Sequence, residues 1–218
     1  MFRISPSQLD SFAYYLSVED SEKSDAVRQE MLDSLRGIKV ANEAMQAGID
    51  FETDVFNYAQ GIYEAGKNDK YNACVAECAE NIYGSIYQYH VERVIDGVCI
   101  HGVIDFLNRN NITDLKACDS YSIGKYQERS QHLIYLACLE DFGIDHFTYL
   151  VSDFRNVYKE DYVWQPTMLD TLRGRITRFF DYLENDVEMK TAFEAKDHNK
   201  QTWQDAILLK GDLHAVQS

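Results

Sequence analysis

The chain has 218 residues, of which 45% are hydrophobic and 26% charged, and it contains only two prolines. This length and composition predict one globular domain and exclude a disordered or collagen-like chain. The 21 Lys and Arg residues against 36 Asp and Glu residues give a net charge of −15, which by itself argues against broad binding to nucleic acid or to an anionic membrane, because both need a positive surface.

The amino terminus lacks the apolar core of a secretory signal, and the longest apolar run, residues 133–139, is far shorter than the roughly 20 residues of a membrane helix. Five cysteines, an odd number, are scattered along the chain. They are typical of reduced thiols in a cytosolic protein. We therefore expect a soluble, cytoplasmic protein with no membrane partner.

The first part of the chain predicts helices. A short helix over 5–16 is capped by Ser5 or Ser7, the charged stretch 18–30 is a solvated helix or a loop, and a long helix over 38–63 is interrupted by Gly48. Cys74 and Cys78 share a face if residues 71–84 are helical. Because no second pair at ligand spacing accompanies them, buried thiols are the better interpretation than half of a metal site.

From residue 86 the spacing of the apolar residues changes from that of helices to that of β-strands. Alternating residues over 86–95, an Asp96-Gly97 turn and a β-branched run over 98–107 predict a hairpin, and a second turn at 108–111 leads to a third strand over 112–117. A helix over 125–142 ending at Gly143, a strand over 144–152, an amphipathic helix after Pro166 and a polar helical tail follow.

These elements predict an α/β fold with a central mixed sheet of four to five strands flanked by helices, in the order αβββαβ. We expect a single domain over residues 1–218. Its N-terminal helical segment covers about 1–36 and its C-terminal helical extension about 167–218.

The second hairpin predicts a site. If Arg109 and Asn110 form a two-residue turn, Asp105 lies directly opposite Asp114, and like charges across a ladder are destabilising unless something compensates them. A hard divalent cation would do so. Lys116, two residues after Asp114, lies on the same face. Taken singly, either aspartate also fits a polar turn, and Lys116 also fits an edge strand.

Together with their neighbours, these residues resemble a known family. Gly102-Val-Ile-Asp105 followed by Thr113-Asp114-Leu-Lys116 resembles the signature of the PD-(D/E)XK nuclease superfamily, which has a restriction-endonuclease-like core. Gly48-Ile-Asp-Phe-Glu52 is similar to its first-helix motif, although Asp50 stands where a histidine often precedes the glutamate. Gln131-His-Leu-Ile-Tyr135 is similar to the Q-x-x-x-Y motif of the RecB-like branch, which includes CRISPR-associated and phage-recombination exonucleases.

The resemblance implies roles for these residues. Glu52, Asp105, Asp114 and the Leu115 carbonyl would bind one or two Mg²⁺ or Mn²⁺ ions, Lys116 would be catalytic with the two aspartates, and Gln131 and Tyr135 would position the substrate. Glu52 also fits a solvated helix residue, Gln131 a cap and Tyr135 a core residue. The cysteine pattern of members with an iron–sulfur cluster is absent, so no cluster is expected.

The resemblance implies a magnesium- or manganese-dependent deoxyribonuclease, an exonuclease rather than an endonuclease, acting in DNA recombination, repair, or phage or CRISPR DNA processing. Its substrate would be single-stranded DNA or duplex ends, and a homo-oligomer would be compatible with the resemblance. Arg173, Arg175 and Arg178, in the helix after Pro166, are the best candidates for a local positive strip, which Lys125 and Arg129 beside the Gln131 helix could extend. The alternatives are a catalytically silent nuclease fold that binds a recombination or DNA-processing protein through its acidic surface, and a sequence-specific endonuclease.

Overall fold

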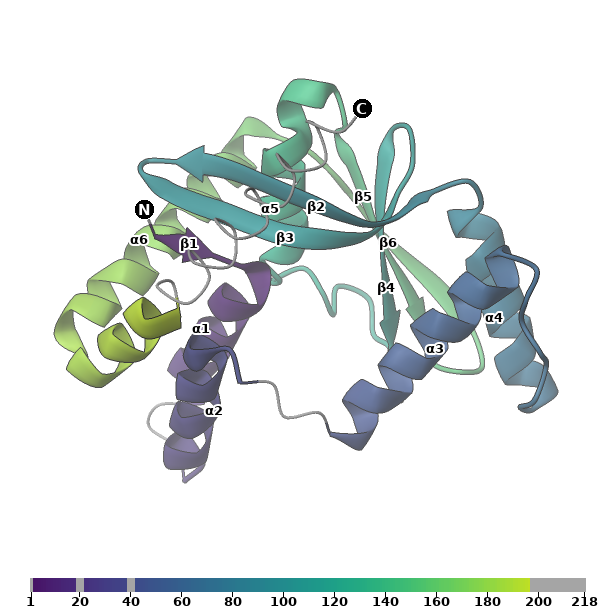
Figure 1. The fold of residues 1–218 in the computed structure, drawn as a ribbon, viewed down its shortest axis with the longest axis horizontal. Helices are drawn as coiled ribbons and strands as arrows, with labels where there is room; N and C mark the ends of the chain where they lie inside the picture. Colours follow the sequence, from purple (N-terminus) through teal and green to yellow (C-terminus); the bar gives the residue numbers. More distant parts are fainter. Residues whose placement is uncertain (1, 19–21, 39–41, 197–218) are drawn as a thin grey trace, which may run out of the picture.

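The computed structural model describes residues 2–18, 22–38 and 42–196, and it places helices on both faces of a twisted sheet (Figure 1). None of the helices in these residues is long and apolar enough to cross a membrane. The helices are α1 (Pro6–Val18), α2 (Ser24–Arg36), α3 (Glu43–Ala59), α4 (Asp69–Ile82), α5 (Gln131–Leu139), the 3-10 turn η1 (Glu140–Phe142) and α6 (Pro166–Asn185). The strands are β1 (Arg3–Ile4), β2 (Ile86–Ile95), β3 (Val98–Leu107), β4 (Asn111–Ala117), β5 (His146–Ser152) and β6 (Val157–Val163).

The sheet is mixed, as the sequence predicts. Its order is β1-β3-β4-β5-β6 with β2 paired to β3, so β2, β3 and β4 form the predicted antiparallel meander and β5 runs parallel to β4. The described residues contain six strands, so the prediction of four to five was too low. The two-residue β1 is too short to leave a pattern, and β6 is an edge strand whose charged residues Lys159, Glu160 and Asp161 hide its alternation.

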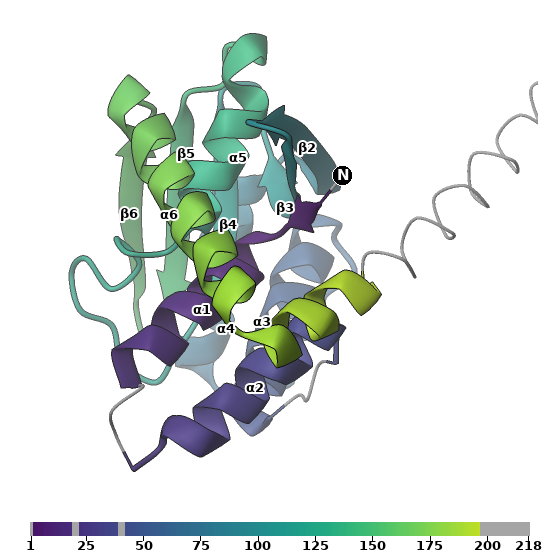
Figure 2. The ribbon, with the colours of Figure 1, turned by 90° about the vertical axis from the view of Figure 1, so that its left-hand side faces the viewer.

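Two hydrophobic cores cover the two faces of the sheet. The larger lies against α1, α2, α5 and α6, and the smaller lies against α3 and α4, which stand apart from the other helices (Figures 1 and 2). Cys74 and Cys78 are buried in the smaller core, as expected for structural thiols. The strands β3 and β4 lie between the two cores, so their side chains can be fixed from both faces.

The helices near the N-terminus depart from the sequence prediction in two places. The segment expected to be solvated forms most of α2, which buries Val27, Met31 and Leu35 because these apolar residues recur at helical spacing among the charges. Helix α3 begins at the Asn42 cap, whose side chain accepts a hydrogen bond from the Met45 amide, and runs through Gly48 without interruption. A glycine in a helix lowers stability without breaking the helix.

Helix α5 is shorter than predicted. It begins at Gln131, because residues 123–128 form turns, and every residue from His132 to Leu139 is buried. A helix that is buried all round belongs to the core. Gly143 has a φ of 72° and follows η1, as expected for the glycine that ends a helix.

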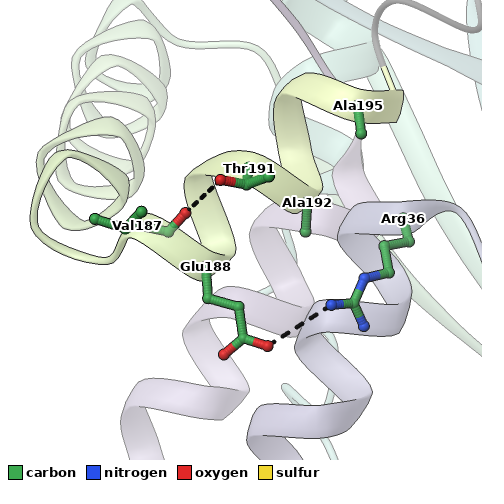
Figure 3. A pocket seen from close by; sticks show the side chains of 6 residues that line it. All are labelled: Arg36, Val187, Glu188, Thr191, Ala192 and Ala195. Atoms are coloured by element: carbon green, nitrogen blue, oxygen red, sulfur yellow. Dashed lines mark hydrogen bonds and ion pairs between the residues drawn. The ribbon is translucent and has the colours of Figure 1, made fainter.

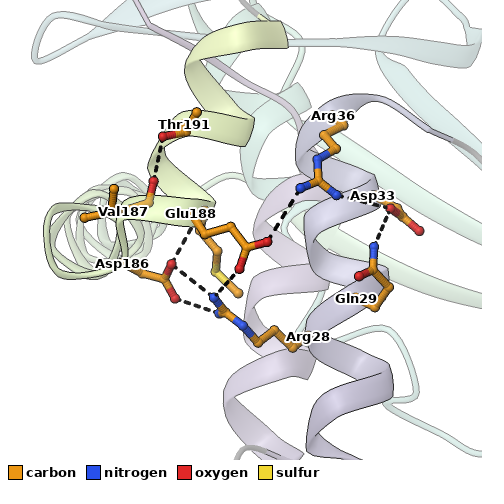
Figure 4. Close-up of polar contacts among 9 residues, drawn as sticks. Arg28, Gln29, Asp33, Arg36, Asp186, Val187, Glu188 and Thr191 are labelled. Atoms are coloured by element: carbon orange, nitrogen blue, oxygen red, sulfur yellow. Dashed lines mark hydrogen bonds and ion pairs between the residues drawn. The ribbon is translucent and has the colours of Figure 1, made fainter.

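The predicted polar tail is packed rather than solvated in its described part. Residues 187–196 are helical and bury Met189 and Phe193, whereas residues 197–218 lie outside the described residues. Ion pairs fix this helix to α2: the Arg28 guanidinium lies 2.6 Å from Asp186 and 3.0 Å from Glu188 (Figure 4). A shallow groove of about 590 Å³ follows the same junction (Figure 3).

The ion pair with Arg28 predicts a pH-dependent contribution to stability. Asp186 also caps the following helix by accepting a hydrogen bond from the Met189 amide, a role that asparagine keeps. Asp186→Asn therefore keeps the cap but removes the charge and one of the two hydrogen bonds accepted from Arg28, and it is expected to lower the free energy of unfolding by about 1 kcal/mol at neutral pH. Urea unfolding measures this, with the exposed Asp181→Asn as the control that should change little.

The sign of the pH dependence follows from the direction of the shift. The hydrogen bond from Arg28 lowers the pKa of Asp186, and a lowered carboxyl pKa adds stability that is lost as pH falls through the native pKa. The difference between Asp186→Asn and the wild type should therefore shrink as pH falls below about 4. A difference that stays constant with pH would contradict the role of the charge.

Candidate active site

The register of the β3–β4 hairpin is the predicted one. Leu107 pairs with Ile112 and Phe106 with Thr113, so Asp105 and Asp114 occupy the next opposed positions. The regular ladder ends there, and the Asp105 carboxylate instead accepts a hydrogen bond of 3.3 Å from the Leu115 amide. The two aspartates therefore lie close together where β3 and β4 begin to separate.

Asp114 is the centre of the site. It is fully buried, its Oδ1 accepts a hydrogen bond from Gln131 Nε2, and its Oδ2 forms an ion pair with Lys116 Nζ. Oδ2 is itself buried, and the Lys116 ammonium is its polar partner. The Lys116 side chain as a whole is 29% exposed, whereas the Asp114 side chain is 1% exposed.

Gln131 and Tyr135 lie on one face of α5, as their spacing predicts. Gln131 is the first residue of α5, and Tyr135 one turn later donates a hydrogen bond of 2.7 Å to the Val103 carbonyl of β3. The Tyr135 ring lies directly over Gly102, where an added Cβ would overlap Cε1 and lie 3.1 Å from Cζ. The glycine of the Gly102-Val-Ile-Asp105 motif thus allows α5 to approach β3.

Glu52 reaches the site from the opposite face of the sheet. It lies on α3, and its Oε1 accepts hydrogen bonds from Tyr87 Oη at 3.2 Å and from Gln88 Nε2 at 3.3 Å. Both donors belong to β2, beside Asp105 of β3. α3, β2, β3 and β4 therefore each contribute polar side chains to one region.

The pKa values of Asp105 and Glu52 are both raised in this region. Burial raises the pKa of Asp105 well above its usual range, and the charges of Asp114 and Glu52 add to this rise. Burial and then the charge of Asp114 also raise the pKa of Glu52, although hydrogen bonds from Tyr87 and Gln88 partly oppose this. Acids whose pKa is raised by burial and by neighbouring charges are typical of functional sites.

Lys116 balances part of this negative charge. Burial by itself lowers the pKa of Lys116, but the attraction of Asp114 and Asp105 outweighs burial and raises the pKa above its usual value. Lys116 is therefore an ammonium at neutral pH. It can donate hydrogen bonds and stabilise negative charge.

The predicted positive strip is only partly close to the site. Arg173 pairs with Asp96 at 3.0 Å in the β2–β3 turn, at the end of the hairpin remote from Asp105. Arg175 donates a hydrogen bond of 3.1 Å to Oγ of Ser130, which is next to Gln131, and it forms an ion pair of 3.2 Å with Glu128. Arg178 is exposed on α6. The structure thus brings Arg175 alone of the three to the start of the Gln131 helix.

The two other predicted cations are also engaged near this helix. Lys125 donates a hydrogen bond of 2.7 Å to the Ser120 carbonyl, and the Arg129 guanidinium lies 3.7 Å from the Asp10 carboxylate.

Within the described residues, no group of three or more His, Cys, Asp or Glu side chains is arranged so that it could hold a metal ion. The three acids of the site are therefore near one another without forming a ready-made cage.

Tyr87 and Gln88 are the site residues that the sequence does not predict. Gln88 adopts a φ of 55°, which is uncommon for a residue other than glycine and is not readable from its side-chain type. The alternation of residues 86–95 treats both as ordinary strand residues. Only the contacts with Glu52 identify them.

Solved structures of other proteins share the fold of this chain at low sequence identity. No protein-family model matches the sequence, and no curated protein matches it. The solved structure of LHK-Exo, an alkaline exonuclease from Laribacter hongkongensis, in complex with dAMP has a TM-score of 0.50 at 15% identity, covering 88% of this chain and 93% of that one. A candidate exonuclease from Eubacterium rectale has a TM-score of 0.51 at 11% identity, covering 89% and 82%. The chain shares the fold of these proteins, which confirms the nuclease fold predicted from the motifs.

Proposed function

We propose that this chain is a divalent-metal-dependent deoxyribonuclease that degrades DNA from its ends. The observation that carries the proposal is the meeting of Asp105, Lys116 and Gln131 around the buried Asp114 carboxylate, at the predicted register of β3 and β4. The likeness to exonuclease folds supports the same reaction class, and one of those proteins binds dAMP, a mononucleotide of the kind that an exonuclease releases.

The acids of the site fit a hard cation in their chemistry. Carboxylate oxygens are the ligands that Mg²⁺ and Mn²⁺ prefer, and Asp114 Oδ2 is a buried carboxylate oxygen paired with the Lys116 ammonium. Glu52, Asp105 and Asp114, with the Leu115 carbonyl, would hold one or two ions. A bound ion would supply a water of lowered pKa and would offset the charge on the scissile phosphate.

The remaining residues have roles that follow from their protonation and contacts. Lys116 donates from its ammonium and would orient the attacking water and stabilise the negative charge that develops on the phosphate. Gln131 holds one oxygen of Asp114 by its amide, so it fixes the orientation of this carboxylate. Tyr135 fixes α5 against β3, and with Gln131 would position the nucleotide.

DNA would be held weakly, because most candidate cations already have acidic partners. Arg173 and Arg175 are paired with Asp96 and Glu128, and the chain carries a net charge of −15. DNA phosphates would then bind Arg178 directly, and they would bind Arg173 and Arg175 by displacing the acidic partners of these two residues. Such binding falls steeply with salt concentration.

The same pairing favours a second candidate function. A catalytically silent chain could use its acidic surface to bind a basic DNA-processing protein, because Arg173 and Arg175 are neutralised internally and the excess negative charge remains. Binding of the purified chain to DNA, compared with binding to basic DNA-handling proteins, separates the two candidates.

The direct test incubates the purified chain with linear duplex, single-stranded and closed circular DNA, with Mg²⁺, with Mn²⁺ or with a chelator. We expect mononucleotides from linear DNA, intact circles, and no products from Asp114→Ala or with the chelator. Cutting of circles would indicate an endonuclease instead. Intact DNA under all conditions, together with equal Mn²⁺ binding by the wild type and Asp114→Ala, would contradict the proposal.

A further inference from the structure

Helix α3 by itself fixes Glu52 weakly. Only Phe51 and Val55 of its 17 residues are buried, and its first turns lie outside the body of the molecule (Figure 1). Glu52 is the neighbour of Phe51, so its backbone is anchored, but a glutamate side chain has several rotatable bonds. Its carboxylate needs partners from another element to hold one orientation.

Tyr87 provides the first such partner. Its ring is stacked on Phe56, one turn after Glu52 on α3, with ring centroids 4.3 Å apart, and it contacts Phe106, the neighbour of Asp105, at 5.4 Å. From this position its hydroxyl donates to Glu52 Oε1 at 3.2 Å. The Tyr87 ring therefore joins the helix of one proposed ligand to the strand of another.

Gln88 provides the second partner, at the cost of a strained backbone. The β2–β3 ladder pairs Tyr87 with Phe106 and Tyr89 with Ile104, and it omits the pair between them, Gln88 opposite Asp105. Gln88 has a φ of 55° there, and its amide donates to Glu52 Oε1 at 3.3 Å. Residues held in this region of φ without being glycine are concentrated at functional sites.

We propose that Tyr87 and Gln88 are positioning residues, which hold Glu52 Oε1 so that Oε2 faces the site as a ligand for the divalent cation. This inference rests on the proposed nuclease function. Both donors bind the same oxygen, and within the described residues no hydrogen bond to Oε2 is formed. Partners behind a metal ligand typically change metal affinity by 10–100-fold when removed.

Two variants separate this role from a structural one. Tyr87→Phe keeps the ring contacts with Phe56 and Phe106 and removes only the hydroxyl. Gln88→Gly removes the amide and places at φ 55° the residue that adopts this conformation without strain. The matched control is Tyr89→Phe, on the same strand, where the tyrosine is 41% exposed.

The measurements are Mn²⁺ affinity by calorimetry, thermal unfolding without metal, and kinetics on linear DNA. Tyr87→Phe and Gln88→Gly are each expected to bind Mn²⁺ about tenfold more weakly than the wild type. Each should also lose about tenfold in kcat, with KM little changed. Metal-free Gln88→Gly should unfold at the same temperature as the wild type or higher, because strain is relieved. Tyr89→Phe should match the wild type throughout.

The outcomes distinguish this inference from the function on which it rests. A wild type that cleaves DNA, with Tyr87→Phe and Gln88→Gly binding Mn²⁺ as tightly as Tyr89→Phe does, overturns the positioning role alone. A Gln88→Gly chain that unfolds at a lower temperature with unchanged Mn²⁺ affinity also overturns it, because Gln88 is then structural. A wild type that neither cleaves DNA nor binds Mn²⁺ overturns both.

Discussion

Lys116→Ala is expected to lower the rate of DNA hydrolysis by about 10²–10³-fold, the range found when a donor that stabilises developing negative charge is removed. The substitution takes away the only ammonium that forms an ion pair with Asp114 among the described residues. The attacking water then loses a donor, and the charge that develops on the phosphate loses a cation. Single-turnover kinetics on linear DNA measure the loss without interference from product release.

The same substitution has a second expected effect, on metal-free stability. Without the ammonium, Asp114 and Asp105 face each other with less compensation, so the free energy of unfolding should fall by about 1–3 kcal/mol, less than for a fully buried pair because Lys116 is 29% exposed. Mn²⁺ should restore more stability to Lys116→Ala than to the wild type, since it would replace the missing positive charge.

Two variants control the experiment. Lys116→Arg keeps the charge and should recover stability but little activity, because a planar guanidinium does not replace a compact ammonium at a tight site. Lys70→Ala removes an exposed lysine at the start of α4 and should change neither rate nor stability. Hydrolysis by Lys116→Ala at the wild-type rate would contradict the catalytic role.

The hairpin of the site could be predicted because local rules determine it. A two-residue turn fixes the register of an antiparallel pair, and the pairing of Leu107 with Ile112 follows from Arg109 and Asn110 alone. The i, i+4 spacing of Gln131 and Tyr135 likewise fixes their common face. These two local patterns provide most of the residues around Asp114.

What could not be predicted depends on tertiary contacts. The φ of Gln88 is imposed by the neighbouring strand and helix, since glutamine has no local preference for φ of 55°. The partners of the arginines could not be predicted either. The sequence shows that Arg173 and Arg175 are close together on α6, but their ion pairs with Asp96 and Glu128 join segments 77 and 47 residues apart. Long-range pairing of charges leaves no periodic signal in a sequence.

Gly102→Ala is expected to lower the free energy of unfolding by about 3 kcal/mol, at the upper end of the usual cost of overpacking. The added methyl group would overlap Tyr135 Cε1, and the buried tyrosine ring has no room to move without breaking its 2.7 Å hydrogen bond to the Val103 carbonyl. Thermal unfolding should detect a fall of about 6–12 °C for a chain of this size.

A second glycine, in an uncrowded position, tests whether the loss of stability in Gly102→Ala comes from steric overlap. Gly48 lies within α3 with nothing within 4 Å of an added Cβ, so Gly48→Ala should raise the free energy of unfolding by up to about 1 kcal/mol. Combining Gly102→Ala with Tyr135→Leu tests the cause, because a smaller side chain removes the overlap. The double variant should then be more stable than the sum of the single effects predicts.

The position of Tyr135 links this packing to the proposed activity. Tyr135 lies one turn after Gln131, whose amide holds Asp114, so a displaced α5 would also release the carboxylate. We expect Gly102→Ala to lose hydrolytic activity at temperatures where it remains folded, and Gly48→Ala to keep its fold at higher temperature than the wild type. An additive double variant, or a Gly102→Ala chain as stable as Gly48→Ala, would show that α5 does not depend on the close approach at Gly102.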